Sequence, residues 1–409
     1  MKQLFTITVL FITVTCFSQP NNNITIGKID TVPSKILNET RRIWVYIPAS
    51  ANNKMFTKQV YPVVYLLDGP SHFHSVTGLI QQLSSVSGNT VLPEMIVVGI
   101  QNTDRTRDLT PTHNTTSVFG QTPAMLKTSG GADNFLAFIE KELMPYIDTT
   151  YPVAPYKMLV GHSFGGLLVM HTLVNKPELF NSYVAIDPSL WWDDQALVRK
   201  ATTALQQNAF PAKPFYIAIA NILGTKTSIS EIEKDTTQTS IGMRSAFHFV
   251  KTLDKYKKAN QPWNWKYYPD DSHGSVPLIA EYDAFRTIFK GHQLALPAKP
   301  EDMVVELFKS HYQRVSALMG YKIYPPEMRI NRMGYTLMEM EKLDQAYGFF
   351  KLNMENYPSS FVVYDSMGDY YLAKGEKEKA IEYFKKALTL KDFPETRKKL
   401  EKLTQVLMK

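Results

Sequence analysis

The chain has 409 residues, of which 44% are hydrophobic and 20% are charged, a composition that is ordinary for a globular protein and excludes a disordered or fibrous one. Its 45 Lys and Arg residues only slightly outnumber its 38 Asp and Glu residues, and no region concentrates the excess. A nucleic-acid-binding surface is therefore not expected. At about 100–200 residues per domain, the length predicts two or three domains.

The first 20 residues have the pattern of a secretory signal peptide. Lys2 precedes an apolar stretch, Leu4–Val14, which is followed by the small residue Ser18. Cleavage there removes residues 1–18, including Cys16, the single cysteine of the chain. We therefore expect an exported protein, periplasmic or extracellular, with no disulfide, no thiol nucleophile and no transmembrane segment once the signal is removed.

Short apolar runs alternate with helical patterns over the domain that we assign to residues 19–295. Several runs are almost wholly apolar, which is typical of parallel strands covered on both faces. The predicted strands are Ile43–Ile47, Val60–Leu67, Met95–Ile100, Tyr156–Gly161, Tyr183–Ile186, Phe215–Ala220 and Trp265–Tyr268. Apolar residues at helical spacing predict helices over Asn134–Tyr146 and Ser240–Leu253. This order predicts an α/β fold with an open, mostly parallel sheet and helices on both faces.

A linker rich in proline, residues 296–300, precedes a region whose pattern is helical only. A repeat of 34 residues pairs Gly334 with Gly368, Ala346 with Ala380 and Phe350 with Phe384. This spacing fits tetratricopeptide repeats, in which small residues let two helices approach closely. We therefore assign residues 301–409 to a small all-α domain. Repeats of this type form a surface that can bind a protein partner.

A candidate nucleophile lies in the segment Gly161-His162-Ser163-Phe164-Gly165. This G-x-S-x-G pattern follows a buried strand and opens an apolar helix, Leu167–Val174, which is the context of a nucleophile elbow. In such an elbow the glycines leave room for a sharp turn, and the helix N-terminus favours developing negative charge. The pattern predicts that Ser163 is the nucleophile.

The general base should be a histidine that follows the nucleophile and the last strand. His273 fits, because it lies in a turn after Trp265–Tyr268 and before a helix that begins near Pro277. His162 is beside the serine but faces away from it in an elbow, and the other histidines lie too early, within helices or in the tail. His273 is the predicted base.

The acid that orients this base should lie between Ser163 and His273 in the sequence. We favour Asp235, just before the helix Ser240–Leu253, and three alternatives remain open: Glu231, Glu233 and Asp187. The oxyanion hole needs two backbone N–H groups. Phe164 is the expected first donor, and the second is Gly69 or Ser71, because Pro70 has no N–H.

Four further side chains are candidates for the substrate pocket: Trp191, Trp192, His72 and His74. The tryptophans follow a strand at the edge where this fold binds ligands. The two histidines lack a third partner at metal-ligand spacing, so we expect them at the pocket mouth and predict no metal site. Arg105 and Arg107 follow another strand and could bind an anionic group or be solvated.

Four segments together resemble the putative-esterase family of α/β-hydrolases, which includes esterase D-like enzymes, enterochelin (siderophore) esterases and mycolyltransferases. They are Leu66-Leu67-Asp68-Gly69, Gly161-His162-Ser163-Phe164-Gly165-Gly166, Pro188-Ser189-Leu190-Trp191-Trp192 and His273-Gly274. The resemblance covers about residues 24–292 and is nearest to the siderophore-esterase branch. It implies an α/β-hydrolase fold and a serine carboxylic-ester hydrolase that needs no cofactor, with Ser163 as nucleophile and His273 as base.

These patterns predict an exported serine esterase that acts on a small ester through an acyl-enzyme. Acyl transfer to an alcohol instead of water is the alternative on the same fold. A non-catalytic binding or assembly protein that uses the repeat tail is the alternative from another class. The Ser163–His273 pair favours the enzyme, and the tail, which catalysis does not require, favours the binding protein.

Overall fold

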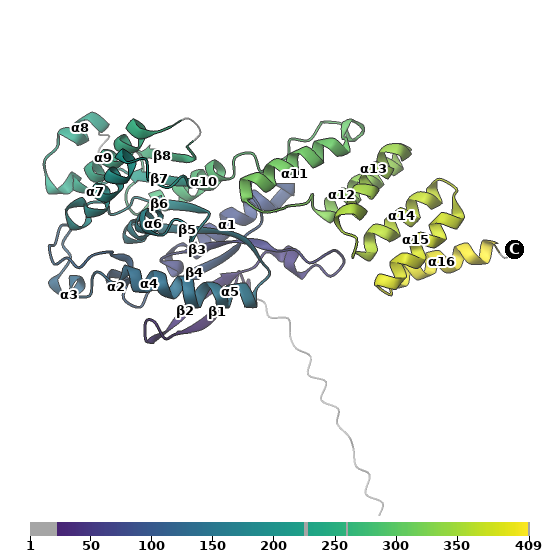
Figure 1. Cartoon of the computed structure of the whole chain (residues 1–409), viewed down its shortest axis with the longest axis horizontal. Coiled ribbons are helices and arrows are strands. Elements are labelled where there is room, and N and C mark those ends of the chain that lie inside the picture. The colour runs from purple at the N-terminus through teal and green to yellow at the C-terminus, as the bar shows by residue number, and fades with distance from the viewer. Residues whose placement is uncertain (1–22, 225–227, 259–260, 408–409) are drawn as a thin grey trace, which may run out of the picture.

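The computed structural model describes residues 23–407 except 225–227 and 259–260 (Figure 1). The expected signal peptide and Cys16 lie outside the described residues. No helix within the described ranges combines the length and the apolar character that crossing a membrane requires.

The described residues form one eight-stranded sheet in the order β1-β2-β4-β3-β5-β6-β7-β8. Pairing is antiparallel from β1 to β4 and parallel from β4 to β8, which confirms the predicted mostly parallel sheet. The strands are β1 (Lys28–Ser34), β2 (Glu39–Tyr46), β3 (Tyr61–Leu66), β4 (Ile96–Ile100), β5 (Val153–His162), β6 (Ser182–Ile186), β7 (Phe215–Ala220) and β8 (Trp263–Tyr268). The strand β1 was not predicted, because it is an edge strand with mostly exposed residues and an internal proline.

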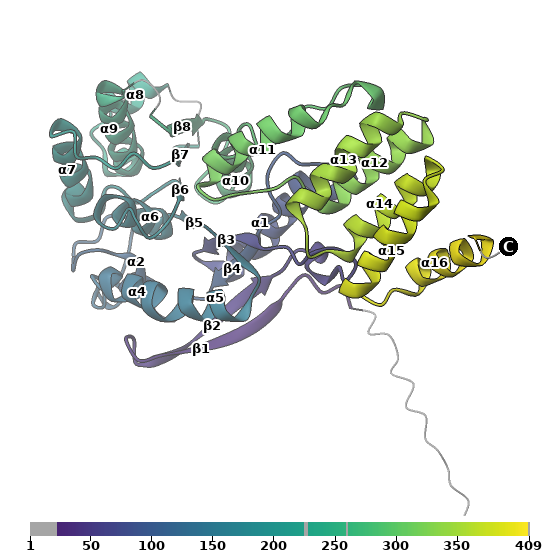
Figure 2. The same cartoon turned by 45° about the vertical axis from the view of Figure 1, so that its right-hand side comes forward.

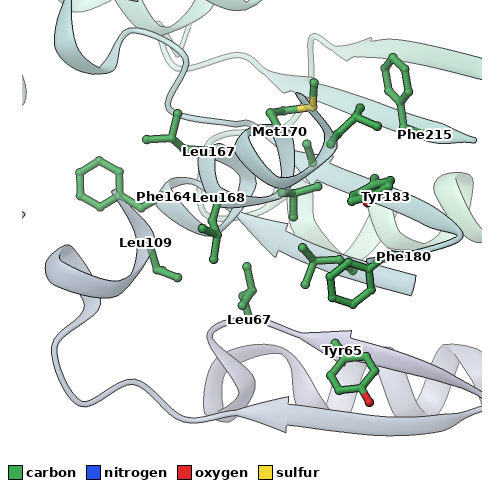
Figure 3. Packing of buried hydrophobic residues seen from close by; sticks show 14 of the residues in the cluster. Tyr65, Leu67, Leu109, Phe164, Leu167, Leu168, Met170, Phe180, Tyr183 and Phe215 are labelled. Carbon is green, nitrogen blue, oxygen red and sulfur yellow. The ribbon is translucent and has the colours of Figure 1, made fainter. Parts of the chain in front are cut away.

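Helices cover both faces of the sheet, so the central strands are buried throughout. In β3, Val63 and Tyr65 belong to one hydrophobic cluster, whereas Val64 and Leu66 belong to the other. The first cluster, shown in Figure 3, lies under α6 (Phe164–Asn175), α7 (Trp192–Gln206) and α9 (Ile241–Tyr256). The second lies under α1 (Gly69–Ser84) and α10 (Val276–Ile288). This alternation follows from the two-residue period of a strand.

The helix expected over Asn134–Tyr146 consists of three parts: α4 (Ala132–Phe138), a π-turn (Ile139–Leu143) and α5 (Met144–Thr150). The widened turn ends at Leu143, two residues before Pro145. Proline has no N–H to give to the preceding turn and its ring crowds the carbonyl four residues earlier. A π-turn accommodates this without ending the helix.

The tail is all-helical, as the repeat pattern predicts (Figures 1 and 2). Its helices are α11 (Val305–Met319), α12 (Glu327–Glu339), α13 (Leu343–Asn356), α14 (Phe361–Ala373), α15 (Lys377–Leu390) and α16 (Pro394–Leu407). A Cβ added to Gly334 would lie 2.5 Å from the Phe350 ring, and one added to Gly368 would lie 2.5 Å from the Phe384 ring. The glycines of the 34-residue repeat therefore leave room for the aromatic ring of the second helix against the first helix of each pair.

The tail contacts the α/β unit through the packing of α11 and through a hydrogen bond to one buried carboxylate. Val315 and Met319 of α11 join the hydrophobic cluster of α1 and α10, and Figure 2 shows α11 beside α10. Glu327, which is 2% exposed, accepts a hydrogen bond from the backbone N–H of Thr57 at 2.8 Å. The expected boundary between residues 295 and 301 remains a prediction, and α11 packs against both parts of the chain.

Candidate active site

Ser163 lies in a sharp turn between β5 and α6, at the carboxyl edge of the sheet. Its backbone has φ 60° and ψ −119°, a conformation that costs about 1–3 kcal/mol and that clusters at functional sites. A Cβ added to Gly161 would lie 2.5 Å from the backbone of Gly165, so the strand and helix can approach this closely only because residue 161 is glycine. The turn predicted from the G-x-S-x-G pattern is present.

Asp187 leaves the sheet beside Ser163. His162 pairs with Ile186 across the parallel strands β5 and β6, so the residue that follows each of them emerges at the same edge. One carboxylate oxygen of Asp187 accepts a hydrogen bond from the backbone N–H of Ala220 at 3.0 Å. The other lies 2.5 Å from Nδ1 of His273. The neighbouring strand therefore orients the carboxylate toward the imidazole.

His273 lies in the loop between β8 and α10, and its side chain is 46% exposed. Asn221, the first residue after β7, donates two hydrogen bonds to the backbone of this loop. Its N–H donates to the carbonyl of Asp271 at 2.8 Å, and its side-chain amide donates to the carbonyl of Pro269 at 2.9 Å. The sheet edge thus positions both the imidazole and its carboxylate partner.

The carboxylate that contacts His273 is not that of Asp235, the favoured acid, but that of Asp187, one of the three alternatives. Asp235 ends α8 (Ile229–Lys234), where its carboxylate accepts the N–H of Thr237 at 2.7 Å. Glu231 is occupied in a capping box with Ser228. Glu233 pairs with Lys251 on α9. A signal for Asp187 was available, because this residue directly follows a strand that the sequence predicts.

The two expected oxyanion donors are the first residues of two helices. Phe164 begins α6 and Gly69 begins α1, so neither amide has a partner within its own helix. The alternative donor, Ser71, gives its N–H to the carbonyl of Asp68 at 2.9 Å. Of the two alternatives, Gly69 is therefore the residue whose backbone N–H makes no hydrogen bond within this turn.

A cavity of about 590 Å³ lies in front of Ser163 and is lined by both Asp187 and His273. Its walls are largely apolar and aromatic. They include Phe119, Met125, Phe164, Trp191, Ile222 and Met243. Trp191, an expected substrate contact, therefore lines the cavity.

Trp192, His72 and His74 do not line this cavity. The Trp192 indole is buried and donates to Thr112 on the far side of α6. His72 lies beside Glu281 of α10, with 3.6 Å between its Nδ1 and a carboxylate oxygen. The His74 ring packs beside Trp44. The described residues contain no cluster of three metal-ligating side chains.

Arg105 contributes a positively charged side chain to the lining of the cavity. Its guanidinium binds both carboxylate oxygens of Asp68, at 2.7 and 3.0 Å, and lies over the Phe164 ring. Its side chain remains 37% exposed, so it can also contact a ligand. Arg107 instead pairs with Glu39 and Asp108, away from the cavity.

Two groups beside the site, the buried Glu281 and the half-buried His162, have strongly shifted pKa values. Burial raises the pKa of Glu281 on α10 from its usual 4.5 to about 8, although a hydrogen bond from Ser75 partly opposes this. Burial, together with the neighbouring His273 and His72, lowers the pKa of His162 to about 4. At neutral pH both groups are therefore uncharged.

Replacing Glu281 by glutamine should stabilise the fold increasingly as the pH rises from 5 to 9. The folded state keeps the Glu281 proton up to a pH of about 8, whereas the unfolded chain loses it near 4.5. The wild type therefore loses stability across this interval, by up to about 5 kcal/mol. Glutamine cannot ionise and escapes this loss. Urea unfolding of both proteins at several pH values measures the difference, and a difference that stays constant with pH would contradict the assignment.

Comparison with known proteins supports a family assignment. The family model described as putative esterase matches residues 34–260, more than half of the chain. The chain belongs to this family. A tetratricopeptide repeat model matches residues 362–393, within α14 and α15. The predicted family and the predicted repeat tail are thus both confirmed.

Two curated relatives are siderophore esterases. The chain is 31% identical over 169 residues to ferri-bacillibactin esterase BesA of Bacillus subtilis, which covers 39% of this chain and 58% of the relative. It is 32% identical over 149 residues to the siderophore enterobactin esterase of Emericella nidulans, which covers 34% and 49%. The chain spans about half the length of the curated relatives it matches.

A solved structure matches over a greater length. This is an IroE-like serine hydrolase from Shewanella oneidensis, which is 30% identical and has a TM-score of 0.68. The match covers 80% of this chain and 99% of that one. It extends the similarity beyond the segment matched by the curated relatives.

Proposed function

We propose that this protein is a serine carboxylic-ester hydrolase in which Ser163, His273 and Asp187 form the catalytic triad. The observation that carries the proposal is their convergence on one cavity wall: a strained serine at a helix N-terminus and an imidazole bound to a carboxylate 2.5 Å away. This arrangement has the parts that nucleophilic acyl transfer requires.

In the first half of the reaction, the Ser163 hydroxyl attacks the ester carbonyl and His273 accepts its proton. The carbonyl oxygen becomes an oxyanion, which accepts hydrogen bonds from the amide of Phe164 and from that of Gly69. The C–O bond to the alcohol then breaks, and His273 returns the proton to the departing oxygen. Asp187 holds the ring and stabilises its charged form.

In the second half, His273 removes a proton from water, which attacks the acyl-enzyme. The acid leaves and Ser163 regains its proton. Within the described residues no hydrogen bond joins the Ser163 hydroxyl to His273, and we expect a side-chain rotation to form it when substrate enters, since such bonds often tighten only with substrate bound.

The cavity favours an ester with an aromatic acyl group that carries negative or strongly polar oxygens. Phe119, Phe164 and Trp191 offer aromatic faces, and Arg105 offers a positive charge beside Ser163. Catecholate siderophore esters combine these features. The names of the two curated relatives support the broader class of siderophore esters.

A hydrolysis panel tests this substrate class. We expect the purified protein to cleave cyclic catecholate triesters with a kcat/KM at least tenfold above that for hydroxamate-linked or feruloyl esters, and to cleave short p-nitrophenyl esters slowly. Chromatography of the released acids measures each rate. Equal rates for catecholate and simple aliphatic esters would contradict the proposed specificity.

We also propose that residues 1–18 direct export and that the tail binds a protein partner. The pattern of the first 20 residues supports export, and the tetratricopeptide match supports a binding surface. Neither role is required by the hydrolysis itself.

A further inference from the structure

Three imidazole rings from three separate elements form a row that leads from the cavity into the molecule. The His273 ring lies against that of His162, with centroids 4.3 Å apart and planes tilted by 39°. His162 meets His72 edge-on, with centroids 5.6 Å apart. The row ends at Glu281, 3.6 Å from Nδ1 of His72. We call these four residues the imidazole row.

The inner part of the row is enclosed by apolar or self-paired groups. Glu281 is 1% exposed and accepts a hydrogen bond from Ser75 on α1 at 3.0 Å. The strands β6 and β7, which pack against α10, present apolar side chains to it: Val184, Ile186, Ala218 and Ala220. Asp68 and Arg105, the nearest charged pair to His72, bind each other. The inner part of the row therefore faces apolar side chains and an ion pair, and Asp187 bonds to His273 at its outer end.

The three inner members of the row, His162, His72 and Glu281, are uncharged at neutral pH. Burial raises the pKa of Glu281 to about 8 and lowers that of His162 to about 4. Burial likewise lowers the pKa of His72. Nε2 of His162 is buried without a hydrogen-bond partner among the described residues, so this ring is held by packing and not by polar contacts.

The His273 ring has one hydrogen bond, to Asp187, and Asn221 bonds to the backbone of its loop, so a neighbouring ring can restrict the side chain further. Its side chain is 46% exposed, and the space around the following Gly274 is open. The hydrogen bond to Asp187 fixes Nδ1 but leaves the ring free to swing about that contact. The flat face of His162 limits this swing. During catalysis His273 becomes a cation, which an uncharged aromatic face attracts and a charged one would repel.

We propose that His162, backed by His72 and Glu281, is a positioning residue that holds the His273 imidazole in line with Ser163 through a neutral aromatic face. The inference rests on the proposed function, since it assigns to His273 the role of general base. It predicts that the shape and neutrality of the neighbouring ring matter, and that its nitrogen atoms do not.

The test compares His162→Phe with His162→Leu. Leucine removes the aromatic face, and kcat for a p-nitrophenyl ester should fall about tenfold to a hundredfold with KM within twofold, as expected for a misplaced catalytic group. Phenylalanine should restore most of the lost rate because it keeps a flat, neutral ring. His171→Leu is the matched control, because His171 is also a buried histidine but bonds to Asp133 outside the cavity and should retain wild-type kcat.

A second pair of variants leaves the serine turn intact. His72→Leu should lower kcat less than His162→Leu does, and His72→Phe should restore it. Thermal unfolding of each variant separates a lost fold from a lost rate. Equal kcat for His162→Leu and the wild type would overturn the inference, and so would an equal loss for leucine and phenylalanine in folded protein. Hydrolysis that survives Ser163→Ala would instead overturn the proposed function.

Discussion

Replacing Ser163 by alanine should reduce ester hydrolysis to the background rate, a loss in kcat of about 10⁴-fold to 10⁶-fold. The hydroxyl is the atom that forms the acyl-enzyme, and no other side chain of the cavity combines a hydroxyl with the strained turn at the start of α6. The Ser163 side chain makes no hydrogen bond to other described residues, so the variant should fold and unfold like the wild type.

Initial rates with a p-nitrophenyl ester and with the preferred siderophore ester measure this loss. Circular dichroism and thermal unfolding establish that the variant is folded. Ser310→Ala is a matched control, because Ser310 lies on α11 in the tail and bonds only within its helix. Turnover by the Ser163 variant within tenfold of the wild type would refute the nucleophile assignment.

Replacing Asp187 by asparagine should lower kcat by orders of magnitude, toward the 10⁴-fold that removal of a triad acid costs in a serine protease. Asparagine keeps the size of the side chain and can still accept the hydrogen bond from Ala220. It has no negative charge to stabilise the imidazolium, and its amide can force His273 into the wrong tautomer. The loss should therefore appear in kcat, with little change in stability.

Asp235→Asn is the matched control for this variant. The Asp235 carboxylate bonds to Thr237 at the end of α8 and does not line the cavity, so its replacement should leave kcat within twofold of the wild type. A large loss with Asp235→Asn and a small one with Asp187→Asn would return the acid to the position that the sequence favoured.

The sequence was sufficient for the features that depend on local pattern. The buried runs around Val63 and Ile217 predicted central strands, because a strand covered on both faces must be apolar throughout. The glycines at 161 and 165 predicted the turn at Ser163, and at position 161 only glycine fits the close approach of strand and helix. The pair Gly368 and Phe384 predicted a helical hairpin for the same reason.

The features that depend on which strands are neighbours could not be predicted. Asp187 and Asp235 both precede His273 in the sequence, and only the pairing of His162 with Ile186 shows that Asp187 emerges beside the nucleophile. The sequence predicted that His162 faces away from the serine. It gave no sign that this ring faces His273, because the two residues are 111 positions apart.

The tail shows a similar limit. The linker at residues 296–300 suggested a clean division of the chain, yet α11 packs its Val315 and Met319 into the cluster beneath α10. The composition of a linker shows where the sequence pattern changes from α/β to all-helical. Whether the helices on its two sides pack against each other depends on how the chain folds.

The most direct test of the central claim is the site of covalent labelling by a fluorophosphonate, mapped by mass spectrometry of proteolytic peptides. We predict a single adduct on Ser163, formed rapidly by the wild type and at least a hundredfold more slowly by His273→Ala. An unlabelled Ser163, an adduct on another residue, or an equal rate without His273 would contradict the account.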